Sequence, residues 1–340
     1  MKTICIDFGH SGPKALDSEG NSVFLKNLIA PKGKPIDTSS FIGDYDPMNY
    51  CVVEFKGFRY ALGKYANNFK MVRNNVHSGD VMNEDAHMLV LAAIAYLDNS
   101  TNIETNLTLN LPAAEYNKKN KEDYKKQYEG KSFEIKTWDY DRDKMVTNKI
   151  EVVNVDVKVE GFYGLVDYIY DDNLNKLEDR EKFYRGLICV VNIGYFSVGI
   201  TFFEDLKYQI NLTPKDTLEG IKGAYQNIGD ELREQFNISK KPYELEKIIV
   251  EDNCEIDLSS DNVLDVSKVV EAEYKYLAHQ IKSEIKNISP MNEVRTIFLD
   301  GGGAIPIEPY FKKGISFKDP RGASARGGVK WGELLWGENR

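Results

Sequence analysis

A carboxylate, a glycine-bearing turn and a lysine follow one another near the start of the sequence. An apolar run ends at Asp7, Gly9 opens the turn, and Lys14 lies five residues beyond that glycine. Glycine lacks a Cβ, so backbone N–H groups in such a turn can approach an anion closely. A carboxylate can orient a hydrated cation, and a lysine can neutralise phosphate charge. These residue types suit phosphate binding, although a strand followed by a glycine turn also occurs widely without such a site.

The same layout occurs again further along the chain. The apolar run 187–191 leads to Asn192 and then to Gly194, and a third apolar run, 296–299, ends in an aspartate and three glycines at 300–303. The first two copies each carry a cysteine within the apolar run. Related strand-and-turn units far apart in one chain indicate two related halves that face one nucleotide.

A third carboxylate stands at the end of a predicted strand. The strand 149–159, which we expect to contain a bend, is followed by Glu160 and Gly161. A carboxylate at a strand end, just before a glycine turn, is well placed to act on a ligand between domains. An exposed loop acid is the alternative interpretation of Glu160.

Composition limits the classes of function. The chain has 340 residues, and Lys+Arg 44 against Asp+Glu 53 give a formal net charge of −9 at pH 7. This acidic balance argues against direct binding to a nucleic-acid backbone, which requires a basic surface. The cysteines form no CxxC pair, and the histidines lack metal-ligand spacing. No signal peptide or membrane-spanning run is recognisable, so we expect a soluble, cytoplasmic protein that does not bind membranes.

Hydrophobic periodicity predicts the elements between these motifs. We expect hairpin strands at 50–55 and 58–62 and a further strand at 247–250. Helices are predicted at 84–97, 113–127, 164–170, 213–236 and 262–287, and a last one at the C-terminal end. Asn83 is expected to cap the first of these, and Thr213 with Pro214 to start the fourth. The last helix would carry an apolar stripe of Trp331, Leu334, Leu335 and Trp336.

Taken together, these motifs resemble the actin superfamily of ATPases, and most of all the bacterial plasmid-segregation actins of the ParM type. The resemblance covers nearly the whole chain. The matching segments are the first phosphate turn (Asp7, Gly9, Lys14), a connecting Leu111-Pro112 pair, the strand end at Glu160, the adenosine-side turn Gly301–Gly303, and the Ala-x-Ala-Arg-Gly segment at 323–327. The last of these favours ParM-type relatives over sugar kinases and heat-shock chaperone ATPases.

The resemblance implies an α/β fold of the duplicated, ribonuclease H-like actin type. Two domains would surround a nucleotide cleft, and each would carry an inserted subdomain. We expect the first domain at 1–170, with a small insertion at about 30–82, and the second at 171–320, with a mainly helical insertion at about 213–290. Residues 321–340 would form a C-terminal helix that returns to the first domain.

The resemblance also implies the site residues. Glu160 and Asp7 would be catalytic, and Asp7 would hold Mg²⁺ through water. The resemblance implies ATP as the cofactor, with GTP left open. The residues expected to bind it are Asp7, Gly9, His10, Ser11, Gly12, Lys14, Asn192, Gly194, Tyr195, Phe196, Ser197, Gly301, Gly302 and Gly303.

Two positions depart from the family pattern. Asn192 stands where the second phosphate turn usually has aspartate, and Val159 stands where a proline often precedes the catalytic acid. Asparagine retains hydrogen-bonding reach but removes a negative charge that helps to order hydrated magnesium. Slower hydrolysis or altered metal dependence is therefore expected.

The resemblance implies a filament-forming ATPase that hydrolyses its nucleotide on assembly. Its partners would be further copies of itself and a ParR-like DNA-binding adaptor, through which it would segregate plasmid DNA without touching DNA directly. The alternatives are another bacterial or phage cytoskeletal filament, and a small-molecule kinase of the same superfamily. A kinase needs an acid placed as base for a substrate hydroxyl, for which the sequence offers no distinct candidate.

Overall fold

The structure is a computed structural model that describes residues 1–9, 11–37, 46–74, 83–98, 100–215, 218–259, 262–289 and 293–337. The chain forms two compact units. Unit 1 contains Met1–Glu178 and Gly322–Arg340, and unit 2 contains Asp179–Arg321. Each unit is described by itself.

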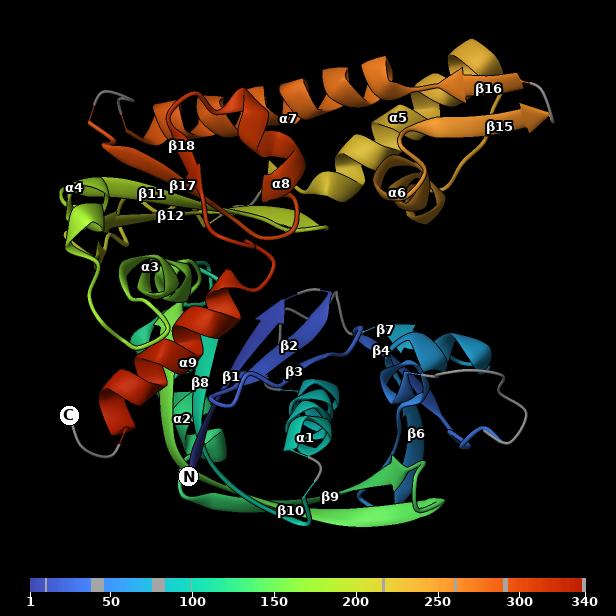
Figure 1. Ribbon diagram of the computed structural model, residues 1–340, viewed down its shortest axis with the longest axis vertical. Coiled ribbons are helices and arrows are strands. Elements are labelled where there is room, and N and C mark those ends of the chain that lie inside the picture. The colour runs from blue at the N-terminus through green and yellow to red at the C-terminus, as the bar shows by residue number, and fades with distance from the viewer. Residues whose placement is uncertain are drawn as a thin grey trace. The chain divides into compact units, whose positions relative to one another are not determined.

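Unit 1 is built on a ten-stranded sheet that curls around one helix (Figure 1). In spatial order its strands are β3 (Ser22–Phe24), β2 (Gly12–Asp17), β1 (Lys2–Gly9), β8 (Asn102–Leu111), β10 (Lys144–Val159), β9 (Lys131–Asp139), β5 (Val52–Phe55), β6 (Phe58–Leu62), β4 (Leu28–Pro31) and β7 (Arg73–Asn74). β8 pairs in parallel with both β1 and β10. The expected bend in β10 is confirmed as a register shift between Val152 and Val155.

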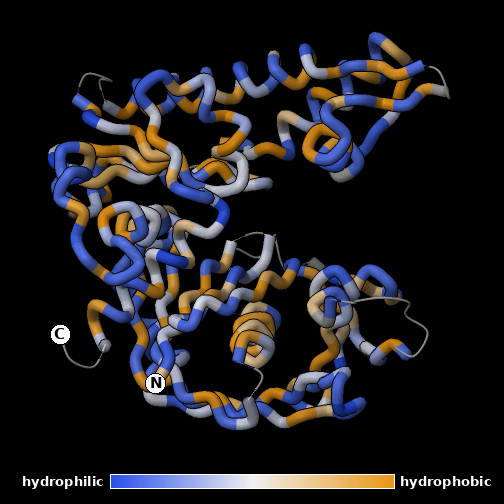
Figure 2. Tube along the Cα trace, viewed as in Figure 1, coloured by the Kyte–Doolittle hydropathy of each residue, from blue (hydrophilic) through white to orange (hydrophobic). Residues whose placement is uncertain are grey.

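The helix inside the curl is α1 (Glu84–Asp98), and its residues from Met88 to Ala95 are all buried. Figure 2, which colours the chain by hydropathy, shows this helix mostly in the orange of hydrophobic residues. A helix that is hydrophobic on every side must be enclosed by other elements. The Asn83 side chain accepts a hydrogen bond from the backbone N–H of Ala86 at 2.8 Å, so the predicted cap is confirmed.

The opposite face of the central strands is covered by α3 (Phe162–Ile169) and α9 (Ala323–Trp336). Ile4 and Ile6 belong to the core around α1, whereas Cys5, between them, packs with Tyr163 and Val329. The predicted apolar stripe on α9 is only partly present. Trp331 packs against Phe162 with ring centroids 5.1 Å apart, whereas Leu334 and Leu335 are 36% and 46% exposed. The buried residues of α9 are mostly small: Ala323, Ser324, Ala325, Gly327, Gly328, Val329, Lys330 and Gly332.

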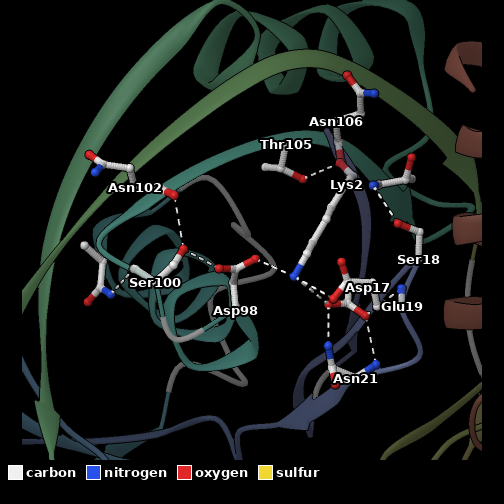
Figure 3. A network of polar contacts seen from close by, with 12 residues as sticks. Lys2, Asp17, Ser18, Glu19, Asn21, Asp98, Ser100, Asn102, Thr105 and Asn106 are labelled. Carbon is white, nitrogen blue, oxygen red and sulfur yellow. Dashed lines mark hydrogen bonds and ion pairs between the residues drawn. The ribbon is translucent and has the colours of Figure 1, made fainter. Parts of the chain in front are cut away.

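Lys2 fixes the start of β1 to its surroundings (Figure 3). Its Nζ lies 2.7 Å from Asp98 at the end of α1 and 3.0 Å from Glu19. Asp17 is buried, and its carboxylate accepts hydrogen bonds from the backbone N–H groups of Glu19 and Asn21. Burial opposes ionisation of Asp98, but the hydrogen bond from Lys2 holds the pKa of Asp98 below its usual value. These contacts join β1, α1 and the β2–β3 turn at one end of unit 1.

The remaining short elements of unit 1 flank this sheet. They are α2 (Lys118–Tyr128) and the 3-10 turns η2 (Pro47–Tyr50) and η3 (Gly63–Asn68). The strand pair β5–β6, expected as part of an insertion, continues the main sheet through β9. Residues 38–45 and 75–82 of that expected insertion lie outside the described residues.

Unit 2 contains a second sheet and most of the remaining helices. Its strands are β13 (Lys207–Tyr208), β12 (Ser197–Glu204), β11 (Leu187–Ile193), β17 (Thr296–Asp300) and β18 (Gly314–Ser316), with β14 (Leu218–Glu219) paired to β12. Its helices are α4 (Glu181–Tyr184), α5 (Ile221–Phe236), α6 (Pro242–Val250), α7 (Ser267–Ile288) and α8 (Ala304–Ile307), with 3-10 turns η5 (Glu178–Arg180, which begins at the boundary) and η6 (Glu308–Tyr310). A hairpin of β15 (Glu255–Ser259) and β16 (Asn262–Asp265) lies near α5 and α6 (Figure 1).

Several predicted element boundaries are wrong. The helix expected from Thr213 starts at Ile221, because the Thr213 hydroxyl instead accepts the backbone N–H of Phe202 at 3.1 Å. The strand expected at 247–250 is the end of α6, in which Leu245 and Ile248 are buried on one side. The helices expected from 113 and 262 begin at Lys118 and Ser267.

Candidate functional site

In unit 1, the carboxyl ends of three neighbouring strands meet at one edge of the sheet. Ile6 of β1, Leu109 of β8 and Val157 of β10 lie opposite one another in the parallel register. The residues that follow them along these strands therefore reach the same edge, where open α/β sheets bind ligands. Asp7 and Glu160 both belong to this edge.

Asp7 is held by two donors from different strands. Its Oδ1 accepts a hydrogen bond from Nδ2 of Asn110 at 2.7 Å, and its Oδ2 lies 3.4 Å from Nζ of Lys14. Asp7 is 8% exposed. A carboxylate with a donor on each oxygen has a fixed orientation.

The two described glycines of the first turn, Gly9 and Gly12, differ in what surrounds them. Gly12 has a φ of 119°, and a Cβ at this position would lie 1.9 Å from the carbonyl O of Leu25. Only glycine fits there, so the fold itself requires it. A Cβ on Gly9 would meet nothing within 4 Å, which leaves room beside the backbone. Ser11 lies in the turn, and its carbonyl accepts the N–H of Asn27 at 2.9 Å. His10 lies outside the described residues.

Glu160 directly follows β10. Its backbone N–H donates to the carbonyl of Leu111 at 2.8 Å, and its side chain is half-buried. Gly161 has a φ of 87°, and α3 begins at the next residue. The left-handed glycine allows the chain to turn from strand to helix within one residue. Glu160 therefore occupies the strand end that the sequence predicted.

Asn110 is the site residue that sequence reasoning missed. It lies 9% exposed at the end of β8, in a run whose neighbours are apolar, and Pro112 follows shortly after. A buried side-chain amide near the end of an apolar strand requires a hydrogen-bond partner. That signal was present in the sequence, but the partner becomes evident only from the parallel pairing of β8 with β1.

In unit 2, the second predicted turn is held by the start of α5. Gly194 donates its N–H to the carbonyl of Ser197 at 2.9 Å. The carbonyls of Gly194 and Tyr195 accept the N–H groups of Ile221 and Lys222 at 3.2 and 2.8 Å. The first N–H groups of a helix have no partner within the helix, and here they fix the backbone of the turn.

The aromatic residues of this turn pack among themselves. The rings of Tyr195 and Phe196 meet edge to face with centroids 5.0 Å apart, and Tyr195 also contacts Tyr225. Nζ of Lys222 lies 5.3 Å from the centroid of the Phe196 ring. Burial raises the pKa of Tyr195. These contacts give the two aromatic side chains a packing role in the structure.

The third turn, at Gly301–Gly303, lies against the second. Asn192 of β11 and Asp300 of β17 are opposite partners in the parallel register. Gly301 has a φ of 83°, and a Cβ there would lie 2.5 Å from Oδ1 of Asn192. Gly303 donates to the carbonyl of Ile193 at 2.9 Å. The structure therefore brings the residues 192–194 and 301–303 together within unit 2.

Comparisons with known proteins show which fold this chain has. Residues 5–162 match the family model described as the N-terminal domain of actin-like proteins. The whole chain has an actin-like fold. An archaeal actin homologue superposes with a TM-score of 0.81 at 14% identity, covering 99% of this chain and 100% of that chain. The psk41 ParM protein gives a TM-score of 0.73 at 15% identity, covering 98% and 97%. A ParM filament protein from Clostridium botulinum gives 0.73 at 16% identity, covering 98% and 99%.

The actin-like fold and the resemblance to ParM-type proteins predicted from the sequence are confirmed by these matches. A search of curated proteins found no match. None of the helices in the described part of the chain is long and apolar enough to cross a membrane.

The donor set around Asp7 fits a magnesium ion that keeps most of its water. Within the described residues, no group of three or more His, Cys, Asp or Glu side chains is arranged to hold a metal ion. Mg²⁺ bound with nucleotide commonly uses one or two carboxylates, substrate phosphates and several waters. Asp7, oriented by Asn110, is suited to such an indirect contact.

The cysteines within the apolar strands do not suit nucleophilic chemistry. Burial raises the pKa of Cys5 to about 12. Burial also raises the pKa of Cys189 well above its ordinary value. A thiol is nucleophilic as its thiolate, so both side chains act as small apolar groups in the core.

Proposed function

We propose that the chain is a cytoplasmic ATPase of the ParM type that polymerises with bound nucleotide and hydrolyses it on assembly. It would position or segregate plasmid DNA through a ParR-like DNA-binding adaptor. The observation that carries this proposal is the buried Asp7 carboxylate, oriented by Asn110 and Lys14 at the same strand edge as Glu160.

Ligands and assemblies of structurally similar proteins support the proposal. The archaeal actin homologue has been solved in complex with ADP, and Bacillus thuringiensis ParM with AMPPNP. The Clostridium botulinum ParM forms a 15-stranded filament. The net charge of −9 fits a filament whose adaptor, rather than the filament itself, contacts DNA.

In the proposed reaction, Glu160 orients or deprotonates the attacking water. Gly9 and Gly302 allow the phosphates and the nucleoside to approach the backbone of their turns, and Lys14 neutralises phosphate charge. Mg²⁺ bound with the nucleotide would supply further charge neutralisation, with Asp7 holding its water. Asn192 contributes a hydrogen bond but no charge at the second turn.

Replacement of Glu160 tests the catalytic assignment. Glu160→Ala should lower assembly-linked phosphate release by about 100-fold or more, because a positioned base contributes about 10²–10⁴-fold. Nucleotide binding, measured by displacement of a fluorescent analogue, should stay near the wild-type value. Unchanged phosphate release in Glu160→Ala would exclude this residue as the base.

Assembly separates the filament function from the kinase alternative. Light scattering should rise after addition of ATP or GTP, and negative-stain microscopy should show filaments with a non-hydrolysable analogue. If scattering does not rise over a wide range of protein concentration, both filament functions fail. If filaments do form, a pull-down of the product of a neighbouring gene with these filaments tests for the adaptor.

A further inference from the structure

Helix α9 contacts the strand that carries one candidate catalytic residue and the helix that begins just after the other. It packs on β1, which ends just beyond Asp7, and on α3, which begins two residues after Glu160. Figure 1 shows α9 running beside α3 and across the central strands. One helix therefore has the two contacts needed to hold these residues in a fixed relation.

Glycines let α9 approach β1 closely and in register. A Cβ on Gly328 would lie 2.1 Å from Sγ of Cys5, and a Cβ on Gly332 would lie 2.4 Å from Cγ2 of Thr3. Four helical residues rise about 6 Å, and two strand residues span about 6.6 Å. The two lengths are nearly equal, so glycines four residues apart on α9 contact residues two apart on β1, namely Cys5 and Thr3. The next turn towards the start of α9 contains Ser324, whose carbonyl accepts from Sγ of Cys5 at 3.7 Å.

The contact of α9 with α3 begins at a third glycine. A Cβ on Gly327 would lie 1.6 Å from the carbonyl O of Tyr163, in the first turn of α3. No other residue type fits at that distance without moving the backbone. The first turn of α3 is the turn that follows Glu160 and Gly161.

The far half of α3 is held by charge. Nε and Nη2 of Arg326 lie 3.0 and 2.8 Å from Oδ2 of Asp167, and Nζ of Lys330 lies 2.8 Å from Oδ1. Lys330 also donates to the carbonyl of Tyr170 at the C-cap of α3 at 2.9 Å. The Asp167 side chain is 7% exposed. A carboxylate this buried requires paired donors, so α3 cannot slide along α9 without leaving it unpaired.

We infer that Arg326 and Lys330 are positioning residues for Glu160, acting through Asp167 and the orientation of α3. α3 has 8 residues and follows Glu160 after the single left-handed residue Gly161. A tilt of so short a helix is passed on to the strand end, because only one residue separates the two. The inference rests on the proposed function, since it assigns the residues that aim the carboxylate of that reaction.

Single-turnover and steady-state hydrolysis by full-length variants test the inference. Arg326→Gln and Asp167→Asn should each lower kcat about tenfold or more, because a misplacement of about 1 Å can reduce a rate by about 10²-fold. The dissociation constant for a fluorescent nucleotide analogue should remain within about twofold of the wild-type value. Arg326→Lys, which keeps the charge but loses the paired N–H donors, should give an intermediate kcat.

Arg233 on α5 supplies a matched control. Its Nη2 also lies 2.9 Å from a carboxylate, that of Asp230, but both side chains are 61% exposed. Arg233→Gln should leave kcat and nucleotide affinity unchanged. Circular dichroism and thermal melts identify any variant that fails to fold, in which case Arg326→Lys remains the decisive variant.

The outcomes separate the two proposals. If the wild-type protein hydrolyses nucleotide and the folded variants match it, the positioning role is wrong and the proposed function stands. A proportional loss of kcat and affinity would indicate general loosening and would also reject the positioning role. If the wild-type protein neither binds nor hydrolyses ATP or GTP, the proposed function fails, and the positioning role fails with it.

Discussion

At the scale of single residues, the two related turns differ in charge. Asp7 carries a carboxylate oriented by Asn110, whereas Asn192 carries an amide beside Gly301. Of these two side chains, only that of Asp7 carries a charge that would order water around a cation in the proposed site. The two positions should therefore respond unequally to exchange of Asp and Asn.

We predict that Asp7→Asn lowers nucleotide turnover about 10- to 100-fold, the range for loss of a group that orients a metal site. Asn192→Asp should change nucleotide turnover less, because it adds a carboxylate at a position where the wild-type protein has none. Malachite-green phosphate assays at several magnesium concentrations measure both. Equal or reversed losses would show that the asymmetry of the two turns has no functional meaning.

His87 makes stability depend on pH. Its Nδ1 lies 3.2 Å from Oη of Tyr128, and its ring packs against Phe55 and Phe133. Burial, followed by the charge of Lys56, lowers its pKa to about 4, while Glu84 opposes and Lys131 adds to the shift. The unfolded chain therefore binds a proton more readily than the folded chain between about pH 6.5 and pH 4.

We predict that this contribution to stability is complete above about pH 6.5 and declines as the pH falls towards 4. The decline should stay below about 1.4 kcal/mol per pH unit, the limit for one proton, because the ring is partly exposed. Urea unfolding at intervals of pH measures it, and His87→Phe should flatten the dependence. His279, exposed on α7, supplies the control, since His279→Gln should leave the pH dependence unchanged.

At the scale of elements, the sequence predicts whether a segment is a helix or a strand better than it predicts the residue at which the segment begins. The helix α1 with its apolar centre, the hairpin β5–β6 and the strand ends at Asp7 and Glu160 follow from local periodicity and capping residues. The start of α5 does not, because Thr213 caps nothing and instead bonds to β12. The run at 248–250 has β-branched residues typical of a strand, but burial of Leu245 and Ile248 on one side makes it helical.

The packing face of α9 could not be predicted from apolar periodicity. Its tryptophans and leucines suggest the stripe, yet contact with β1 and α3 uses Gly327, Gly328 and Gly332. Small residues produce no hydrophobic signal, and their value appears only when the backbone they approach is known. Asn110 was missed for a related reason, since its partner comes from another strand.

We predict that Gly327→Ala lowers the free energy of unfolding by about 1–3 kcal/mol, the range for overpacking a tight contact. Gly223 on α5 is a matched control, because the three atoms nearest to a Cβ there all belong to the flexible side chain of Glu219, whereas those nearest to a Cβ on Gly327 belong to backbone. Gly223→Ala should be neutral or stabilising by up to about 1 kcal/mol, since alanine is the better helix former. Denaturant unfolding compares the two variants, and equal effects would contradict the close contact of α9 with α3.

At the scale of the whole molecule, each unit contributes to the proposed nucleotide site a turn glycine at which the fold leaves space for a Cβ. A Cβ on Gly9 in unit 1 meets nothing within 4 Å, and one on Gly302 in unit 2 meets only Arg321, at 3.5 Å or more. Replacement by alanine at either position should therefore leave the melting temperature of the nucleotide-free protein near the wild-type value.

We predict that Gly9→Ala and Gly302→Ala each reduce the rise in melting temperature caused by ATP or GTP. A ligand at 100 times its dissociation constant stabilises a protein by about 2.7 kcal/mol, so the loss is measurable by differential scanning fluorimetry. Gly301→Ala, in which a Cβ would lie 2.5 Å from Asn192, should instead destabilise the protein without nucleotide. Full nucleotide stabilisation in Gly9→Ala and Gly302→Ala would place the ligand elsewhere.

The contact of α9 with β1 also has a consequence for synthesis of the chain. Cys5 and Ser324 are separated by 319 residues. At about 5–20 residues per second, the ribosome needs roughly 15 to 60 s to make that interval. Throughout that time the face of β1 that contains Asp7 lacks its covering helix, and all of unit 2 is translated before α9 is. Unit 1 is therefore incomplete in a nascent chain until α9 has been made.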